Sequence, residues 1–336
     1  MDDPLDLPSD ELIQQLRGSS REQICNRLEG YREANADVQK ELVRALQSIA
    51  VEQPAVLTPF VPKLLPFLTA EERSVRLTTA KLFVSLSKTR PDAIVDTADV
   101  LAARLADKSE FYYVRARLAE TLGYVAVEYP EKTTTPDLLA DLRTGLSFDE
   151  PEVKEKLAKA LAYVALGNPR RLRHWISDLA AHLDAEDELV RYYLSTAIVA
   201  VGCEQPAALS DSVDELGSRL DDECPYVRGR AAEALGLLAG ATSDTSIVPD
   251  ERLATVGSAS DEPFVTERTR FALARLENES SVDSGDGIAS LESIRDQVDE
   301  IADAIASPDG ECTQCGGSLP EGGPPMCPRC GTPYRG

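Results

Sequence analysis

The sequence contains no run of about 18 uninterrupted apolar residues, which a helix needs to cross a bilayer. It also lacks a basic segment followed by an apolar one at its start, where residues 1–12 read MDDPLDLPSDEL. With 43% apolar and 28% charged residues, the composition excludes wholesale disorder. We therefore expect a soluble, cytoplasmic chain without a membrane partner that is long enough, at 336 residues, to bury a core.

Lysine is scarce: the chain has 9 lysines and 26 arginines, and its 58 carboxylates give a net charge of −23. Binding to phosphate backbones is driven by counterion release to a basic surface, so this balance disfavours general nucleic-acid binding. An acidic, lysine-poor composition resembles that of halophilic proteins, which fold where the Debye length shrinks to about 3 Å near 1 M salt.

Catalytic motifs are missing as well. The sequence has no nucleophile elbow, P-loop or dinucleotide fingerprint. Cys25, Cys203 and Cys224 are scattered in or beside apolar segments, where single cysteines of a cytosolic protein are typically small core residues. We therefore do not expect an enzyme.

A repeat is the dominant feature of the sequence. A valine followed by a basic or polar residue opens an apolar helical pattern seven times, at steps of 37, 39, 39, 37, 37 and 38 residues. Such steps indicate one supersecondary unit copied about seven times. The seven valines are Val38, Val75, Val114, Val153, Val190, Val227 and Val265.

Each unit is expected to be a helical hairpin. Between Phe111 and Tyr129, apolar residues fall at i, i+4, i+8, i+11 and i+12 from Val114, which is one face of a helix. Acidic turns precede this second helix in each unit and should cap it, and a shorter amphipathic helix precedes each turn. Prolines should break the chain between units. They are Pro54, Pro91, Pro130, Pro169 and Pro206.

These patterns resemble a known repeat family. The sequence LAARLAD from Leu101 followed by VRARLAETLG from Val114, and LGSRLD from Leu216 followed by VRGRAAEALG from Val227, resemble HEAT repeats of the kind found in phycobilisome-lyase-like proteins. The resemblance covers 20–278, after an acidic N-terminal segment or cap at 1–19. It implies an all-α fold, a right-handed α-solenoid of about seven hairpins, and a surface that binds other molecules.

Two sets of basic residues recur at the start of the second helices. The residue after each repeat valine (Arg76, Arg115, Lys154, Arg191, Arg228) is expected to join a structural ladder with acidic turns. The second set lies two residues further on and, with nearby aromatic residues, forms a candidate partner-binding strip. The alternative is a solvated face with inter-repeat packing. The strip comprises Arg117, Lys156, Tyr193, Arg230, Arg268, Tyr112, Tyr192 and Tyr226.

The family resemblance suggests two functions. The first is a non-enzymatic scaffold that binds proteins on the surface of stacked repeats. The alternative is a nucleic-acid-binding or HEAT-like DNA repair protein of the glycosylase type, which would need a continuous positive surface. Metal hydroxylases built on HEAT repeats need His-Glu pairs, but neither His174 nor His182 is followed by glutamate.

The chain changes character after the last repeat. Residues 279–287 are polar and glycine-containing, which predicts a flexible linker. Residues 288–306 place apolar side chains three or four apart, which predicts an amphipathic or short coiled-coil helix. Packing onto the array and self-association both remain open for this helix, because fewer than three heptads are marginal as an isolated dimer.

The last segment, 310–336, holds the strongest local motif. Cys312, Cys315, Cys327 and Cys330 form two C-x2-C-G knuckles, and four thiolates at this spacing suit one structural, tetrahedral Zn²⁺. We predict a zinc ribbon that contacts a protein or nucleic acid as a second recognition module. A disulfide framework is disfavoured in the cytosol, and the wider knuckle spacing of rubredoxin-like sites argues for zinc over iron.

Overall fold

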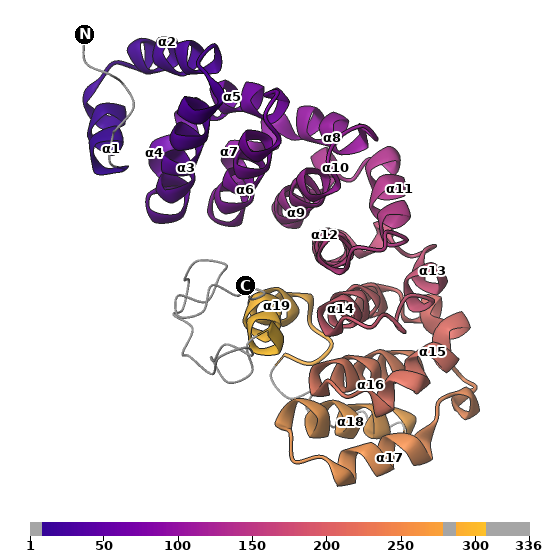
Figure 1. Ribbon diagram of the computed structural model, residues 1–336. Coiled ribbons are helices and arrows are strands. Elements are labelled where there is room, and N and C mark those ends of the chain that lie inside the picture. Colours follow the sequence, from indigo (N-terminus) through magenta and orange to yellow (C-terminus); the bar gives the residue numbers. More distant parts are fainter. Residues whose placement is uncertain (1–8, 278–286, 307–336) are drawn as a thin grey trace, which may run out of the picture. The chain divides into compact units, whose positions relative to one another are not determined.

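The computed structural model describes residues 9–277 and 287–306, and every regular element in these ranges is a helix (Figure 1). The all-α expectation is confirmed for this part of the chain. The chain divides into two compact units, Met1–Gly167 and Asn168–Gly336. The predicted zinc ribbon and 279–286 of the predicted linker lie outside the described residues.

The first unit contains twelve α-helices among its described residues. Their bounds are α1 Ser9–Gly18, α2 Arg21–Arg32, α3 Ala36–Glu52, α4 Pro54–Leu57, α5 Val61–Leu64, α6 Arg73–Thr89, α7 Pro91–Ile94, α8 Ala98–Ala106, α9 Tyr112–Glu128, α10 Pro130–Thr133, α11 Pro136–Gly145 and α12 Pro151–Gly167.

The second unit contains seven α-helices among its described residues. They are α13 Ile176–Ala180, α14 Glu188–Glu204, α15 Val213–Ser218, α16 Pro225–Ala239, α17 Asp250–Ala259, α18 Pro263–Leu276 and α19 Leu291–Ala306. The last of these falls inside the range 288–306 that the sequence predicts to be helical.

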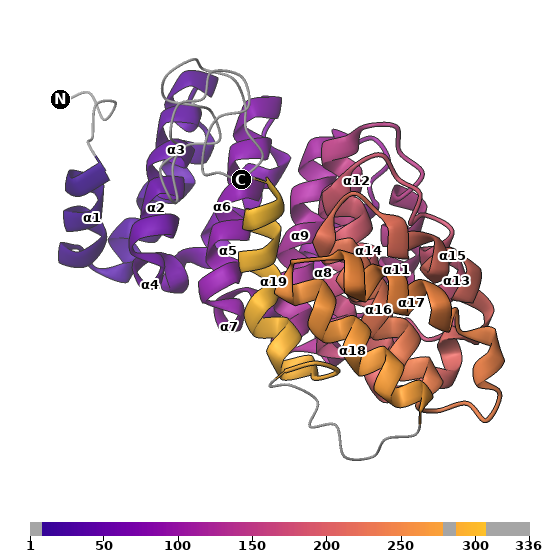
Figure 2. The same ribbon diagram turned by 90° about the horizontal axis from the view of Figure 1, so that it is seen from below.

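The long second helix of each repeat forms an inner layer within its unit. In the first unit α3, α6, α9 and α12 pack in this order, and in the second unit α14, α16 and α18 do the same (Figure 2). Short helices cover the other side, with α8 on α9, α11 on α12, α15 on α16 and α17 on α18. The layers bury the apolar face that the period predicts, because Val114, Leu118 and Leu122 are fully buried.

Prolines and a ladder of charges set the boundaries of the repeats. Each of the five predicted break prolines is the first residue of a short helix or 3₁₀ turn, where its missing N–H costs nothing. Arg191 donates to the carbonyl oxygens of Ala185 and Glu186 at 2.8 and 2.9 Å, and to both carboxylate oxygens of Asp222 at 2.8 Å. Arg76 bonds its preceding turn and Glu110 in the same way, so the structural role predicted for these two arginines is confirmed.

Only some acidic turns cap helices with a side chain. The Asp187 carboxylate accepts hydrogen bonds from two N–H groups at the start of α14, as expected. Glu72 and Glu262 stand at the same place but make no such bond. The acidic side chains of other turns, Glu110 and Asp222, instead bind the ladder arginines, which explains why a turn can be acidic without capping its helix.

Two pairs of inner helices approach each other closely at a glycine. A Cβ atom on Gly123 of α9 would lie 2.9 Å from the Cα of Ala160 in α12, and one on Gly236 of α16 would lie 2.8 Å from the Cα of Ala272 in α18. Both glycines stand nine residues after their repeat valine. The repeat pattern therefore places a residue without a side chain where two backbones meet.

Candidate interaction surface

The residues three positions after each repeat valine form the candidate site. Arg117 and Lys156 lie on neighbouring helices of the first unit, and Arg230 and Arg268 do so in the second. The sequence analysis places these cations at one register position, but it misses the glutamates beside Arg117 and Arg230. Glu120 and Glu233 stand six residues after Val114 and Val227, and aligning the repeats on their valines would have found them.

Glu120 is the centre of the cluster in the first unit. Its side chain accepts a hydrogen bond from Arg117 Nη1 at 2.9 Å, and the Lys159 ammonium lies 3.3 Å from its other oxygen. Burial alone would raise the pKa of Glu120, but the positive charges of Lys156, Lys159 and Arg117 hold that pKa well below its usual range. Lys156 also pairs with Glu155 at 2.7 Å. The cluster is therefore ionised and mostly buried.

Lys81 of α6 extends this cluster toward the surface. Its side chain is half-buried, and it forms no ion pair within 4 Å among the described residues. Burial lowers the pKa of Lys81, and the neighbouring charge of Arg117 lowers it further, whereas Glu152 acts in the opposite direction. The Arg117 side chain keeps 28% of its surface exposed. These two cations are thus the accessible part of the first cluster.

The second unit repeats the arrangement with deeper burial. One oxygen of Glu233 accepts hydrogen bonds from Arg230 Nη1 at 2.7 Å and from Arg268 Nε at 3.0 Å. The side chains of Arg230 and Glu233 have no exposed surface. The Arg268 guanidinium also stacks 3.4 Å from the ring centre of Phe264.

This buried cluster is incompletely paired. Nε and Nη2 of Arg230 and the hydroxyl of Tyr192 are buried and make no hydrogen bond of normal geometry in the part of the chain that the structure describes, although the two side chains lie next to each other. Burial raises the pKa of Tyr192, and the nearby positive charge of Arg230 offsets part of that increase. Tyr193 is buried as well, with 2% of its surface exposed.

The remaining aromatic residues of the strip pack among themselves. Tyr112 is half-buried, and its ring centre lies 4.8 Å from the ring centre of Phe111 and 4.8 Å from that of Tyr113. Tyr226 lies edge-on against Phe264 at 5.1 Å. Five of the eight predicted strip residues are buried: Lys156, Tyr192, Tyr193, Arg230 and Arg268. They stabilise contacts between helices in this structure, and their role in binding a partner stays a prediction.

Other candidate sites carry less chemistry. Among the described residues, no three His, Cys, Asp or Glu side chains are grouped as metal ligands, and the four predicted zinc cysteines lie outside these residues. Burial raises the pKa of Cys203 to about 12, which keeps its thiol protonated. No helix in the described ranges has the length and apolarity to span a bilayer.

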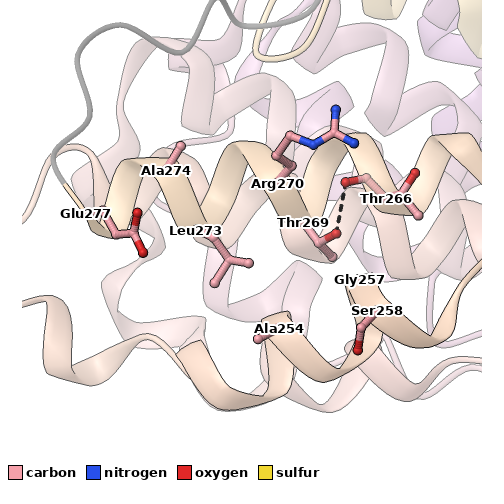
Figure 3. A pocket seen from close by; sticks show the side chains of 9 residues that line it. All are labelled: Ala254, Gly257, Ser258, Thr266, Thr269, Arg270, Leu273, Ala274 and Glu277. Atoms are coloured by element: carbon pink, nitrogen blue, oxygen red, sulfur yellow. Dashed lines mark hydrogen bonds between the residues drawn. The ribbon is translucent and has the colours of Figure 1, made fainter.

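A hollow of about 640 Å³ lies between α17 and α18 (Figure 3). It is lined by three residues of α17, five of α18 and the residue after α18: Ala254, Gly257, Ser258, Thr266, Thr269, Arg270, Leu273, Ala274 and Glu277. The Thr269 hydroxyl in its wall donates to the carbonyl oxygen of Thr266 at 3.1 Å. Most of the lining side chains are small, and they suggest no reaction.

Comparison with known proteins supports the fold. No protein-family model and no curated protein matches the sequence. Among solved structures, the chain is similar to an engineered protein from the Northeast Structural Genomics Consortium, with 21% identity, a TM-score of 0.57, and coverage of 65% of this chain and 97% of that one.

Designed armadillo repeat proteins are also similar. One, YIII(Dq)4CqI, has 20% identity and a TM-score of 0.56 over 64% of this chain and 99% of its own. Another, YIII(Dq.V1)4CPAF, was solved in complex with the peptide (KR)4 and has 19% identity and a TM-score of 0.52 over 64% and 98%. At these identities the likeness establishes a helical repeat fold, which confirms the coarser part of the family expectation.

Proposed function

We propose that the chain is a non-enzymatic interaction scaffold, and that the inner layer of its first unit binds an acidic segment of a protein partner. The observation that carries this proposal is the cation pair Lys81 and Arg117. Both side chains reach the surface of one inner layer, and Lys81 has no carboxylate within ion-pair distance among the described residues. A partner carboxylate placed here would offset their mutual repulsion and the cost of their partial burial.

The negative net charge of the chain favours a partner that is recognised through short-range contacts with the clustered cations. A chain with a charge of −23 does not attract nucleic acid from a distance, and its clustered cations alternate with Glu120, Glu155 and Glu233. In addition, a designed armadillo protein of similar fold is known in complex with a peptide, although that peptide, (KR)4, is basic. The cations of this chain suit the opposite charge.

The proposal includes the zinc ribbon at 310–336 as a second recognition module. In a reducing cytoplasm, Cys312, Cys315, Cys327 and Cys330 stay available as thiolates for one structural Zn²⁺. About 25 residues without a sizeable apolar core need such a metal to fold. The module would contact a second protein or a nucleic acid.

Capture from lysate at high salt tests the scaffold function. Full-length wild type should retain a partner that Lys81→Glu and Arg117→Ala lose. Lys132→Glu is the matched control, because it makes the same charge change on α10, at a side chain with 60% exposure. Equal capture of the same protein by Lys81→Glu, Lys132→Glu and wild type would contradict the proposed surface.

A further inference from the structure

Helix α19 occupies part of the inner layer of the second unit. It packs on α14, and the two helices lie side by side in Figure 1. Three side chains of α19 itself are buried: Ile294 and Val298 are 1% exposed, and Ile301 is 7% exposed. These positions form one apolar stripe along the helix. The rest of the segment is acidic, because residues 287–306 hold five carboxylates and one arginine, a net charge of −4.

The entry into α19 lies directly over the buried cluster. The N–H of Ala289 donates to Oε1 of Glu233 at 2.8 Å, which is the oxygen that Arg230 and Arg268 leave free. Two residues at this entry have left-handed backbone conformations, Gly287 with φ of 104° and Ala289 with φ of 60°. Alanine adopts that conformation at a cost, so the docked segment is strained at its point of attachment.

The docked segment gives the Glu233 carboxylate a further hydrogen-bond donor, but it gives the guanidinium groups of Arg230 and Arg268 no acceptor. Two guanidinium groups share one carboxylate, and the amide of Ala289 adds a further donor rather than an acceptor. Nε and Nη2 of Arg230 lie near the neutral Tyr192 hydroxyl but make no hydrogen bond of normal geometry among the described residues. Buried donors of this kind carry a penalty that a carboxylate would remove.

We propose that this part of the inner layer is a groove for an acidic amphipathic helix of a partner protein, and that α19 occupies it as a displaceable intramolecular competitor. The partner helix would repeat the stripe of α19, with apolar residues at i, i+4 and i+7, and would add a carboxylate near Arg230. It would displace α19 because it satisfies donors that α19 leaves unpaired. This inference rests on the proposed scaffold function and extends it to the second unit.

The test uses the full chain and a fluorescein-labelled peptide of residues 287–306. A Cβ atom on Gly287 would lie 2.1 Å from Ser293 Oγ, at a φ that L residues rarely adopt, so Gly287→Ala should release α19 without altering the groove. We expect Gly287→Ala to bind the peptide at least 10-fold more tightly than wild type. Val298→Asp is a second releasing variant, and unchanged helicity by circular dichroism shows that each variant is folded.

The carboxylate is tested with two matched peptides. Ala289→Asp and Ala289→Asn in the peptide have nearly the same shape, and both residues tolerate a left-handed backbone. We expect the Asp peptide to bind Gly287→Ala at least 5-fold more tightly than the Asn peptide, since the excess guanidinium charge outweighs repulsion from Glu233. Equal or tighter binding of the Asn peptide would overturn the carboxylate preference.

Other outcomes would overturn the groove itself. These are equal peptide binding by wild type, Gly287→Ala and Val298→Asp, or tighter binding of a labelled single-stranded oligonucleotide than of the peptide. The proposed function fails separately, because the Lys81 and Arg117 variants change the first unit only. Peptide binding to Gly287→Ala should stay within 2-fold when Lys81→Glu is added.

Discussion

Glu120 in α9 and Glu233 in α16 stand at the same position of their repeats, and each accepts a hydrogen bond from the arginine three residues before it. In both units a cation of the following helix, Lys159 or Arg268, approaches the same carboxylate. The repeat thus uses one buried glutamate to join two neighbouring inner helices. This arrangement explains why cations recur on the inner layer of an acidic protein.

Glu233→Gln should be strongly destabilising. It removes the charge that both Arg230 and Arg268 need, and breaking a buried pair in this way costs about 3 to 5 kcal/mol. The free energy of unfolding in urea measures the loss. Glu262→Gln is the control, since that side chain makes no cap hydrogen bond at the start of α18. A change below about 1 kcal/mol for Glu233→Gln would contradict the assigned pairing.

Glu120 should make stability depend on acid pH. Its pKa in the folded state is lower than the ordinary 4.5, so the unfolded chain binds the proton more readily. The stabilisation is therefore fully present above pH 4.5 and is lost as pH falls toward the folded pKa. Urea unfolding between pH 7 and pH 3 should show a smaller loss for Glu120→Gln than for wild type. Parallel losses would show that this carboxylate is not held ionised.

Alanine should have opposite effects at two helical glycines. At Gly236 the added Cβ meets Ala272 and Phe271 at 2.8 Å, so Gly236→Ala should destabilise the protein by about 1 to 3 kcal/mol. At Gly30 of α2 no atom lies within 4 Å, and Gly30→Ala should stabilise the protein by about 0.5 to 1 kcal/mol. Thermal unfolding measures both signs, and stabilisation by Gly236→Ala would contradict the close helix approach.

Substitutions at Gly287 and Ala289 should change the stability of α19 docking in opposite directions. Ala289→Gly removes a left-handed alanine and should strengthen docking by about 1 kcal/mol, whereas Gly287→Ala should weaken it. Amide hydrogen exchange over 291–306 reports the result directly. Protection should rise in the first variant and fall in the second, and identical protection in both would show that the entry geometry does not control docking.

The predicted zinc ribbon should bind metal and fold in one step. Elemental analysis should give about one zinc per chain, and Cys327→Ser should lose it, because binding energy of order 10 kcal/mol drives folding of such sites. The main thermal transition should stay in place, since each inner helix packs against its neighbours in the array, as α9 does against α6 and α12. Iron in place of zinc, or a large shift of that transition, would contradict the prediction.

The repeat architecture is readable from the sequence because its determinants are local and periodic. Val114, Leu118 and Leu122 mark the buried face by spacing alone, and Pro130 marks the break that follows. The arginine ladder is predictable for the same reason, since Arg191 recurs beside an acidic turn. Each of these features depends only on contacts within one repeat or between that repeat and its neighbour.

The buried part of the candidate site cannot be predicted from the sequence in this way. Glu120 looks like an ordinary surface acid in a chain with 58 carboxylates, and its burial depends on helices from two repeats. The sequence leaves packing of 288–306 onto the array open, but α19 docks on α14, which joins segments about 100 residues apart, and no period predicts that partner helix. The sequence therefore indicates which cations share a register position but not which of them are covered.

Site-specific photocrosslinking tests the central claim, that a partner binds the inner layer of the first unit. Benzoylphenylalanine replaces Thr78, which stands in α6 at the register position of Arg117, or Val100, which is 52% exposed on α8 in the outer layer. We predict an adduct with the captured partner from position 78 and none from position 100. An adduct from position 100 alone would contradict the account.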